Sequence, residues 1–242
     1  MTTDLLPVVY QDQYLAVIDK PSGLLVHRSR LASGASQFAM QMLRDQLGQH
    51  VYPVHRLDRP TSGLLVFALD SETARLVNQQ WAEQTVEKTY HAVVRGYIDD
   101  QGLIDYPLKE ELDKIADKNA REDKEAQQAI TEYRCLERVE LPFKVSKKHD
   151  TTRYSLVELK PKTGRKHQLR RHMSHIRHPI IGDSRHGEGR HNRFFQDQFD
   201  SHRLLLAATN IRFQHPHTDE LLDLSVELPD ELMRAFRARS LE

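Results

Sequence analysis

The chain has 242 residues, of which 38% are hydrophobic and 29% charged, and its 35 Lys and Arg are balanced by 35 Asp and Glu. This composition excludes a disordered chain, and no stretch approaches the ~20 consecutive apolar residues of a membrane helix. No basic segment leads into an apolar run at the N-terminus, and a lone Cys135 cannot form an internal disulfide, so we expect a cytoplasmic protein.

In the N-terminal half, apolar runs separated by turn residues predict short strands and two amphipathic helices. Pro21 and Gly23 favour a turn, and Gly48 can end the first helix. Strands are expected at Val8–Asp19 (two short strands), Leu24–His27, Leu64–Leu69 and Lys88–Gly96, and helices at Ser36–Leu47, with Ser36 as cap, and Ser71–Gln84.

The C-terminal half continues with a charged segment, Lys109–Glu125, which is expected to be a solvated helix or a mobile loop. Strands are then expected at Ile130–Leu141, Arg153–Lys160 and Leu204–Phe213, and helices at Lys166–Ile176 and Leu228–Ala238. Strands and helices do not alternate one for one, which favours an α+β fold with a mixed, mainly antiparallel sheet. We expect one domain over residues 1–242, with two lobes that share one sheet.

The distribution of charge is uneven. Between Lys144 and Arg193 there are 14 Lys and Arg against 4 Asp and Glu, whereas the rest of the chain holds 21 against 31. A basic surface on an acidic body fits a polyanion such as RNA, although a solvated basic surface would look the same.

A polar loop, His55–Gly63, carries the best catalytic candidate. Asp58 lies between Arg56 and Arg59, directly before a buried strand. Nearby guanidinium groups keep a carboxylate ionised, so Asp58 could act as a nucleophile or a general base. From the residues alone, an Asp that only caps the loop and pairs with Arg is favoured, since Asp–Arg pairs are common.

A second basic segment, Thr163–His172, is rich in side chains that bind phosphate. The RNA contacts expected here and beside Asp58 are Arg59, Lys166, His167, Arg170 and Arg171, together with Arg165. The spacing of His167, His172 and His175 lacks the i, i+4 pattern of two metal ligands on a helix, so no metal site is predicted. Hydrogen-bonded structural roles or phosphate contacts suit these histidines better.

Together, Asp19–His27, His55–Gly63 and Thr163–His172 resemble the RluA family of pseudouridine synthases. The match to His-Arg-Leu-Asp-x-x-Thr-Ser-Gly at residues 55–63 is specific, and the flanking motifs occur in the family's order. The resemblance extends from Val8 to about Leu224. It implies the pseudouridine synthase fold, with a central active-site cleft, and an isomerase that needs neither cofactor nor metal.

The resemblance also implies roles for single residues. Asp58 matches the essential catalytic aspartate, and Arg56 the arginine that takes the place of the flipped uridine. Tyr90 matches the tyrosine that stacks on the target base. Arg165 matches the basic residue that pairs with the aspartate, and Leu169 the aliphatic residue packed beneath the active site.

The charged run at residues 111–124 resembles the branch of the family that modifies a uridine in the acceptor-stem region of tRNA. No N-terminal S4-like RNA-binding module and no obligate protein partner are expected. Arg177 and His186 depart from the family, which often has Gly and Tyr there. Three alternatives stay open: a synthase acting on ribosomal RNA, a non-catalytic RNA-binding protein, and a sugar hydrolase, although no second carboxylate is evident for the last.

Overall fold

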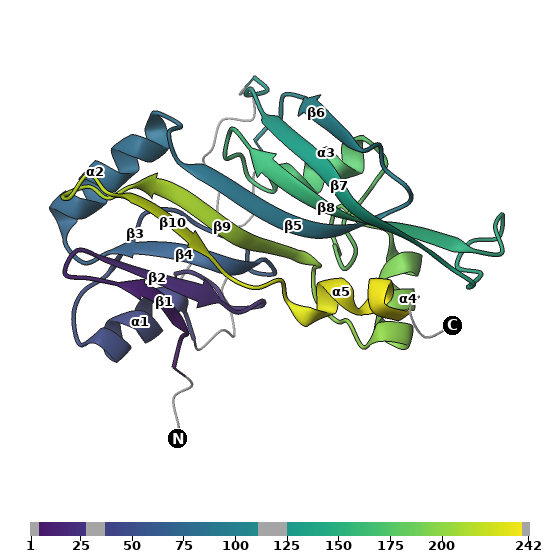
Figure 1. The fold of residues 1–242 in the computed structure, drawn as a ribbon, viewed down its shortest axis with the longest axis horizontal. Coiled ribbons are helices and arrows are strands. Elements are labelled where there is room, and N and C mark those ends of the chain that lie inside the picture. Colours follow the sequence, from purple (N-terminus) through teal and green to yellow (C-terminus); the bar gives the residue numbers. More distant parts are fainter. Residues whose placement is uncertain (1–4, 28–36, 111–124, 239–242) are drawn as a thin grey trace. The chain divides into compact units, whose positions relative to one another are not determined.

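The computed structural model describes residues 5–27, 37–110 and 125–238 (Figure 1). These residues form two compact units. The first contains the described parts of Met1–Lys88 and Ala208–Val226, and the second those of Thr89–Glu110, Ala126–Ala207 and Glu227–Glu242. Within the described ranges, no helix is long and apolar enough to cross a membrane. Most of the charged segment expected at Lys109–Glu125 lies outside the described residues.

The first unit combines a sheet with two helices. Its strand order is β1-β2-β4-β9, with β10 beside β9 and β3 beside β4. The β1–β2, β2–β4, β3–β4 and β9–β10 pairs are antiparallel. The elements are β1 (Val8–Gln11), β2 (Leu15–Lys20), α1 (Ala39–Leu47), β3 (Tyr52–Pro53), β4 (Ser62–Ala68), α2 (Ser71–Ala82), β9 (Leu206–Gln214) and β10 (Leu221–Ser225).

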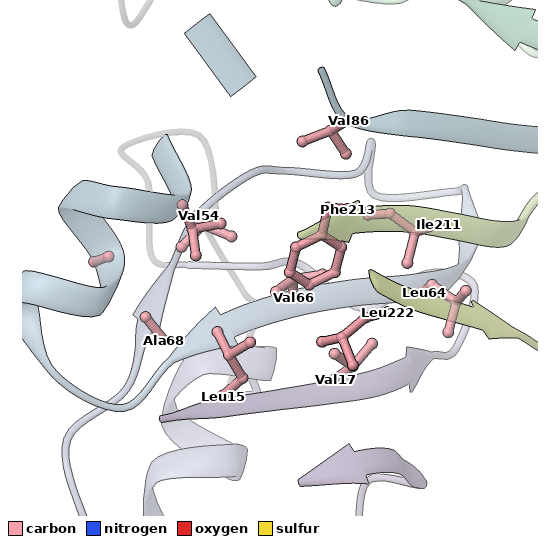
Figure 2. Packing of buried hydrophobic residues seen from close by; sticks show 12 residues of the cluster. Leu15, Val17, Val54, Leu64, Val66, Ala68, Val86, Ile211, Phe213 and Leu222 are labelled. Atoms are coloured by element: carbon pink, nitrogen blue, oxygen red, sulfur yellow. The ribbon is translucent and has the colours of Figure 1, made fainter. Parts of the chain in front are cut away.

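Strand β4 forms the centre of this unit's core. Figure 2 shows Leu64 and Val66 of β4 packed with Val17 of β2 and Phe213 of β9. The intervening Leu65 points to the opposite face of the strand and is also fully buried. A strand that is covered on both faces has a continuous apolar sequence, which explains the run that follows the Asp58 loop.

The second unit is a four-stranded antiparallel arrangement with three helices. Its strand order is β5-β8-β7-β6. The elements are β5 (Glu87–Arg95), β6 (Gln101–Asp105), β7 (Ile130–Leu141), β8 (Thr152–Pro161), α3 (Gln168–His175), α4 (Gly189–Phe199) and α5 (Asp230–Arg237).

Two hydrophobic clusters hold these helices. Helix α3 packs through Leu169 and Met173 against residues such as Leu159 of β8. The other cluster joins α4 and α5 to the long strands and includes Phe195 and Tyr154. The face of α3 that carries Leu169 is therefore fixed by the core.

The predicted α+β class with a mainly antiparallel sheet is confirmed, and β7 has the expected bounds. Helix α1 begins at Ala39, later than predicted, with Phe38 at its N-cap position and no side-chain cap. Helix α3 begins two residues later than predicted because His167 has a left-handed backbone (φ 56°). The sequence interpretation missed α4, β6 and β10. The division into two lobes of one domain stays a prediction.

Candidate active site and RNA-binding residues

Asp58 lies on the loop between β3 and β4. The N–H of Thr61 donates to the carbonyl of Asp58 at 3.0 Å, which closes a tight turn. Leu57 and Thr61 are buried and anchor this turn on either side of a half-buried Asp58. Arg56, in contrast, is exposed. The turn is therefore anchored by buried neighbours around a half-buried Asp58, whereas Arg56 is exposed to the solvent.

The turn at Lys20–Leu24 is hydrogen-bonded to the Asp58 loop. The ammonium of the fully buried Lys20 donates to the carbonyls of Pro21 at 2.8 Å, Leu24 at 2.9 Å and Arg59 at 3.3 Å. A buried ammonium is tolerated only when its hydrogen bonds are made, so these carbonyls are held in place with it.

Further bonds join the same two segments. Ser22 Oγ donates to the carbonyl of Pro60 at 2.7 Å, and the N–H of Gly23 donates to the carbonyl of Arg59 at 2.9 Å. Arg59 Nε donates back to the carbonyl of Gly23 at 3.0 Å. The sequence indicated a turn at residues 20–23, and the structure shows that this turn supports the loop of the catalytic candidate. Arg59, expected to contact RNA, is exposed but takes part in this support.

His55 opens the loop as a structural residue. Its Nε2 accepts the N–H of Val66 at 3.1 Å, and its ring stacks on Trp81 with ring centroids 5.0 Å apart. Burial, with a smaller effect of Lys88, lowers the pKa of His55 to about 3. The neutral ring therefore ties the loop to β4 and is unsuited to act as an acid near neutral pH.

Tyr90 and Leu169 lie in the same hydrophobic cluster of the second unit. Tyr90 is on β5, in register with Leu159 of β8, and is half-buried. Leu169 is buried on the first turn of α3. The structure therefore brings together two residues that the sequence separates by most of the second unit.

Arg165 lies on the turn that precedes α3. Its main-chain N–H donates to Gln168 Oε1 at 3.0 Å, and its Nε donates to the carbonyl of Gln128 at 3.1 Å. Gln168 also accepts from Thr163 Oγ1 and donates to the carbonyl of Ile130. The sequence interpretation missed Gln168, whose only signal was an amide within a basic run.

The other predicted RNA contacts of this segment have different surroundings. His167 Nδ1 lies 3.0 Å from His186 Nε2, and Lys166 is half-buried. Arg171 Nη1 donates to the carbonyl of Lys109 at 2.8 Å. Their contacts with RNA stay predictions.

Arg170 is buried in the second unit and paired with Asp183. It is 5% exposed, and its Nε and Nη2 donate to the two carboxylate oxygens of Asp183 at 2.7 and 2.9 Å. Burial alone would raise the pKa of Asp183, but Arg170 and the N–H groups of His186 and Arg185 hold it below its usual value. The planar fork of the guanidinium is thus engaged inside the protein, and the contact of Arg170 with an RNA phosphate stays a prediction.

The neighbouring histidines have hydrogen-bonding and stacking partners. The fully buried His172 bonds to Thr131 Oγ1 at 2.9 Å and to the carbonyl of Tyr106 at 3.0 Å. His175 stacks on the ring of Tyr106 at 3.7 Å. Among the described residues, no group of His, Cys, Asp and Glu is arranged to hold a metal ion.

The catalytic candidates belong to different units: Asp58 to the first, and Tyr90 and Arg165 to the second. The stacking of Tyr90 on the target base and the pairing of Arg165 with Asp58 therefore stay predictions. The geometry within each unit shows how each side chain is held.

Comparison with known proteins shows the family to which the chain belongs. Residues 14–175 match the family model described as RNA pseudouridylate synthase. The chain belongs to this family. It is therefore an enzyme of the isomerase class whose substrate is RNA, as the resemblance implied.

Relatives support this assignment over almost the whole chain. A protein named tRNA pseudouridine synthase C from Vibrio parahaemolyticus is 58% identical over 231 residues, which cover 96% of this chain and 94% of the relative. A protein of the same name from Vibrio vulnificus is 59% identical over 232 residues, with the same coverage.

Solved structures confirm the fold. Human RNA pseudouridylate synthase domain containing 1 has a TM-score of 0.69 at 26% identity, covering 92% of this chain and 83% of that chain. Human RNA pseudouridylate synthase domain containing 4 has the same TM-score at 27% identity, covering 96% and 92%. The predicted pseudouridine synthase fold is thereby confirmed.

Proposed function

We propose that this chain is a cytoplasmic enzyme that isomerises a specific uridine of tRNA to pseudouridine, with Asp58 as the essential carboxylate. The observation that carries the proposal is the identity of 58% over 96% of the chain to a relative named as a tRNA pseudouridine synthase. Similarity of this extent includes all three motifs and the loop that holds Asp58.

The reaction breaks the bond between N1 of uracil and C1′ of ribose, rotates the base and joins C5 to C1′. The proton of C5 is lost and N1 gains one, so atoms and electrons balance without an oxidant or a reductant. A uridine in stacked RNA must first be flipped out, which costs a few kcal/mol. The exposed guanidinium of Arg56 is suited to enter the vacated stack and offset part of this cost.

Within the site, Tyr90 would stack on the flipped base, with Leu169 packed in the cluster behind it. Asp58 would either attack the ribose or act as a base on it. Arg165 would pair with that carboxylate and orient it. Lys20, Ser22 and the neutral His55 position the loop and touch no substrate atom in this scheme.

Tritium release from RNA labelled at C5 of uridine tests the proposal, because the rearrangement exchanges that hydrogen with solvent. We expect release from unmodified tRNA, and none from tRNA with Asp58→Asn, although this variant folds and binds RNA. The matched control is Asp45→Asn, which alters an exposed carboxylate that pairs with a neighbouring arginine, Arg44. Asp45→Asn should keep full activity.

Each other outcome has a distinct meaning. Turnover by Asp58→Asn would overturn the assignment of the aspartate and leave the enzyme class intact. Release from ribosomal RNA fragments alone would overturn the proposed substrate.

A further inference from the structure

Arg177 ends helix α3 in a conformation that favours glycine. Its φ is 65°, in the left-handed region. Its N–H donates to the carbonyl of Ser174 at 3.0 Å, and the N–H of His178 donates to that of Met173 at 2.8 Å. These two bonds define a Schellman motif, whose left-handed position is usually glycine. Helix α1 follows this rule with Gly48.

The surroundings impose this conformation without help from the Arg177 side chain. Arg95 Nη2 donates to the carbonyl of Arg177 at 3.1 Å, and its main-chain N–H donates to the carbonyl of Pro179 at 3.1 Å. His178 Nδ1 donates to the carbonyl of Arg95 at 2.8 Å. Because the backbone is held from β5, a glycine would fit here and would relieve the cost that a side chain has in this region.

The Arg177 side chain is exposed, and its guanidinium has no hydrogen bond or ion pair with any described residue. Glu188, the carboxylate that pairs with Arg95, also lies within ion-pair distance of Arg190. Within the described ranges, Arg177 therefore combines a left-handed backbone with an exposed guanidinium that makes no hydrogen bond or ion pair. Such strain is a reason to look for a function.

The local charge indicates the ligand. Between Leu159 and Gly182 the sequence contains seven Lys and Arg and no Asp or Glu; one of the seven, Arg170, is buried against Asp183, which leaves six. An arginine fork in such surroundings suits phosphate. Helix α3 has eight residues and is about 12 Å long, so Arg177 lies roughly one helix length from the turn that carries Arg165.

We propose that Arg177 is an RNA-binding residue that contacts a phosphate of the substrate outside the flipped nucleotide. The inference rests on the proposed function, in which Arg165 lies at the reacting uridine. A contact at this distance strengthens binding and leaves the chemical step unchanged. A cation at a helix C-terminus also stabilises the helix dipole, and the test must separate that effect from RNA binding.

The test compares Arg177→Gln, which removes the charge, with Arg177→Lys, which keeps it, and Arg177→Gly, which also relieves the backbone. With enzyme in excess over unmodified tRNA, the rate of tritium release gives a half-saturating concentration and a maximal rate. We expect Arg177→Gln and Arg177→Gly to raise the half-saturating concentration about fivefold to tenfold. The maximal rate should stay within about twofold of the parent value. Arg177→Lys should retain most of the parent affinity for tRNA.

Direct RNA binding at several salt concentrations gives a second measure. Loss of one phosphate contact lowers the slope of log K against log salt by about one, and we expect this for Gln and Gly. The control is Arg134→Gln, which removes an exposed arginine already paired with Glu158 and should leave the slope unchanged. Thermal unfolding should show Arg177→Gly to be at least as stable as Arg177→Gln.

Unchanged affinity and slope in the Gln and Gly variants, with a lower melting temperature for Gln, would mean that Arg177 only stabilises the helix end, and would overturn the inference. If Arg177→Gly were less stable than Arg177→Gln, the left-handed backbone at this position would not be strained, and the inference would lose that premise. If the parent protein binds RNA through Arg177 but makes no pseudouridine, the proposed function fails, while the contact of Arg177 with an RNA phosphate stands.

Discussion

The ammonium nitrogen of Lys20 lies 3.3 Å from the main-chain oxygen of Arg59, so a buried cation holds the residue directly after Asp58. The same ammonium binds the carbonyls of Pro21 and Leu24. The turn and the loop lack regular secondary structure, and this charge supplies a common partner for their backbone oxygens. The motif at Asp19–His27 therefore supports the loop of the motif at His55–Gly63.

Lys20→Met should destabilise the protein by about 3 kcal/mol, because three carbonyls lose a charged, buried donor at once. We expect urea unfolding to show this loss, and tritium release to fall further than stability alone requires because the Asp58 loop loosens. Lys160→Met, an exposed lysine, is the control and should change stability by less than about 0.5 kcal/mol. Unaltered stability in Lys20→Met would contradict the role described above.

His55 should make stability depend on pH. Its pKa is lowered to about 3 in the folded protein, whereas the unfolded value is near 6.5. Above pH 6.5 both states are neutral at this residue and its contribution is fully present. As pH falls below 6.5 only the unfolded state gains the proton, so stability decreases by about 1.4 kcal/mol per pH unit until the folded pKa is reached.

The measurement is the free energy of unfolding between pH 6 and pH 4 in the parent and in His55→Gln, whose amide oxygen can still accept the N–H of Val66. The free energy of unfolding should fall more steeply with decreasing pH in the parent than in the variant. The difference in slope should correspond to the uptake of about one proton, or about 1.4 kcal/mol per pH unit. Other buried histidines, such as His172, have lowered pKa values too and are common to both proteins. Equal slopes in the parent and His55→Gln would show that His55 titrates normally.

Gly63 has a packing requirement as well as a backbone one. Its φ is 109°, and a Cβ atom would overlap the carbonyl of Ala208. It also pairs with Lys20 across β2 and β4. Gly63→Ala should therefore cost at least about 3 kcal/mol, the sum of backbone strain and overpacking.

The control for this substitution is Gly48→Ala, because Gly48 also has a positive φ (68°) but no atom within 4 Å of the added Cβ. Only the backbone cost of about 1 kcal/mol should appear there. Similar losses for both variants, measured by thermal unfolding, would show that the close approach of Ala208 contributes nothing.

Arg170→Met should destabilise the fold by about 3–5 kcal/mol, because it leaves the carboxylate of Asp183 buried without its ion-pair partner. Replacing both residues, as in Arg170→Met with Asp183→Leu, should recover part of this loss. Arg134→Met removes an exposed ion pair and should cost less than about 1 kcal/mol. A small effect of Arg170→Met on urea unfolding would show that the ion pair with Asp183 contributes no more to stability than an exposed one.

Some features could be read from the sequence because their causes are local. The apolar run after Asp58 predicted a strand, and Gly48 predicted a helix end; both are present. The element bounds were less accurate where one residue adopts an unusual backbone, as His167 does before α3. Helix α4 was missed because its sequence, Gly189–Phe199, is mostly polar and its apolar face is defined by packing on Phe195.

The sequence by itself determined the family, the three motifs and Asp58 as the catalytic candidate, since these depend on residue types at fixed short spacings. Only the tertiary structure decided which charged side chains are internal. Arg170 and Arg171 are adjacent in one basic run, yet Arg170 is buried against Asp183 and Arg171 reaches the carbonyl of Lys109. The energy of a charge depends on burial and on partners from distant segments, and a reading of local pattern contains neither.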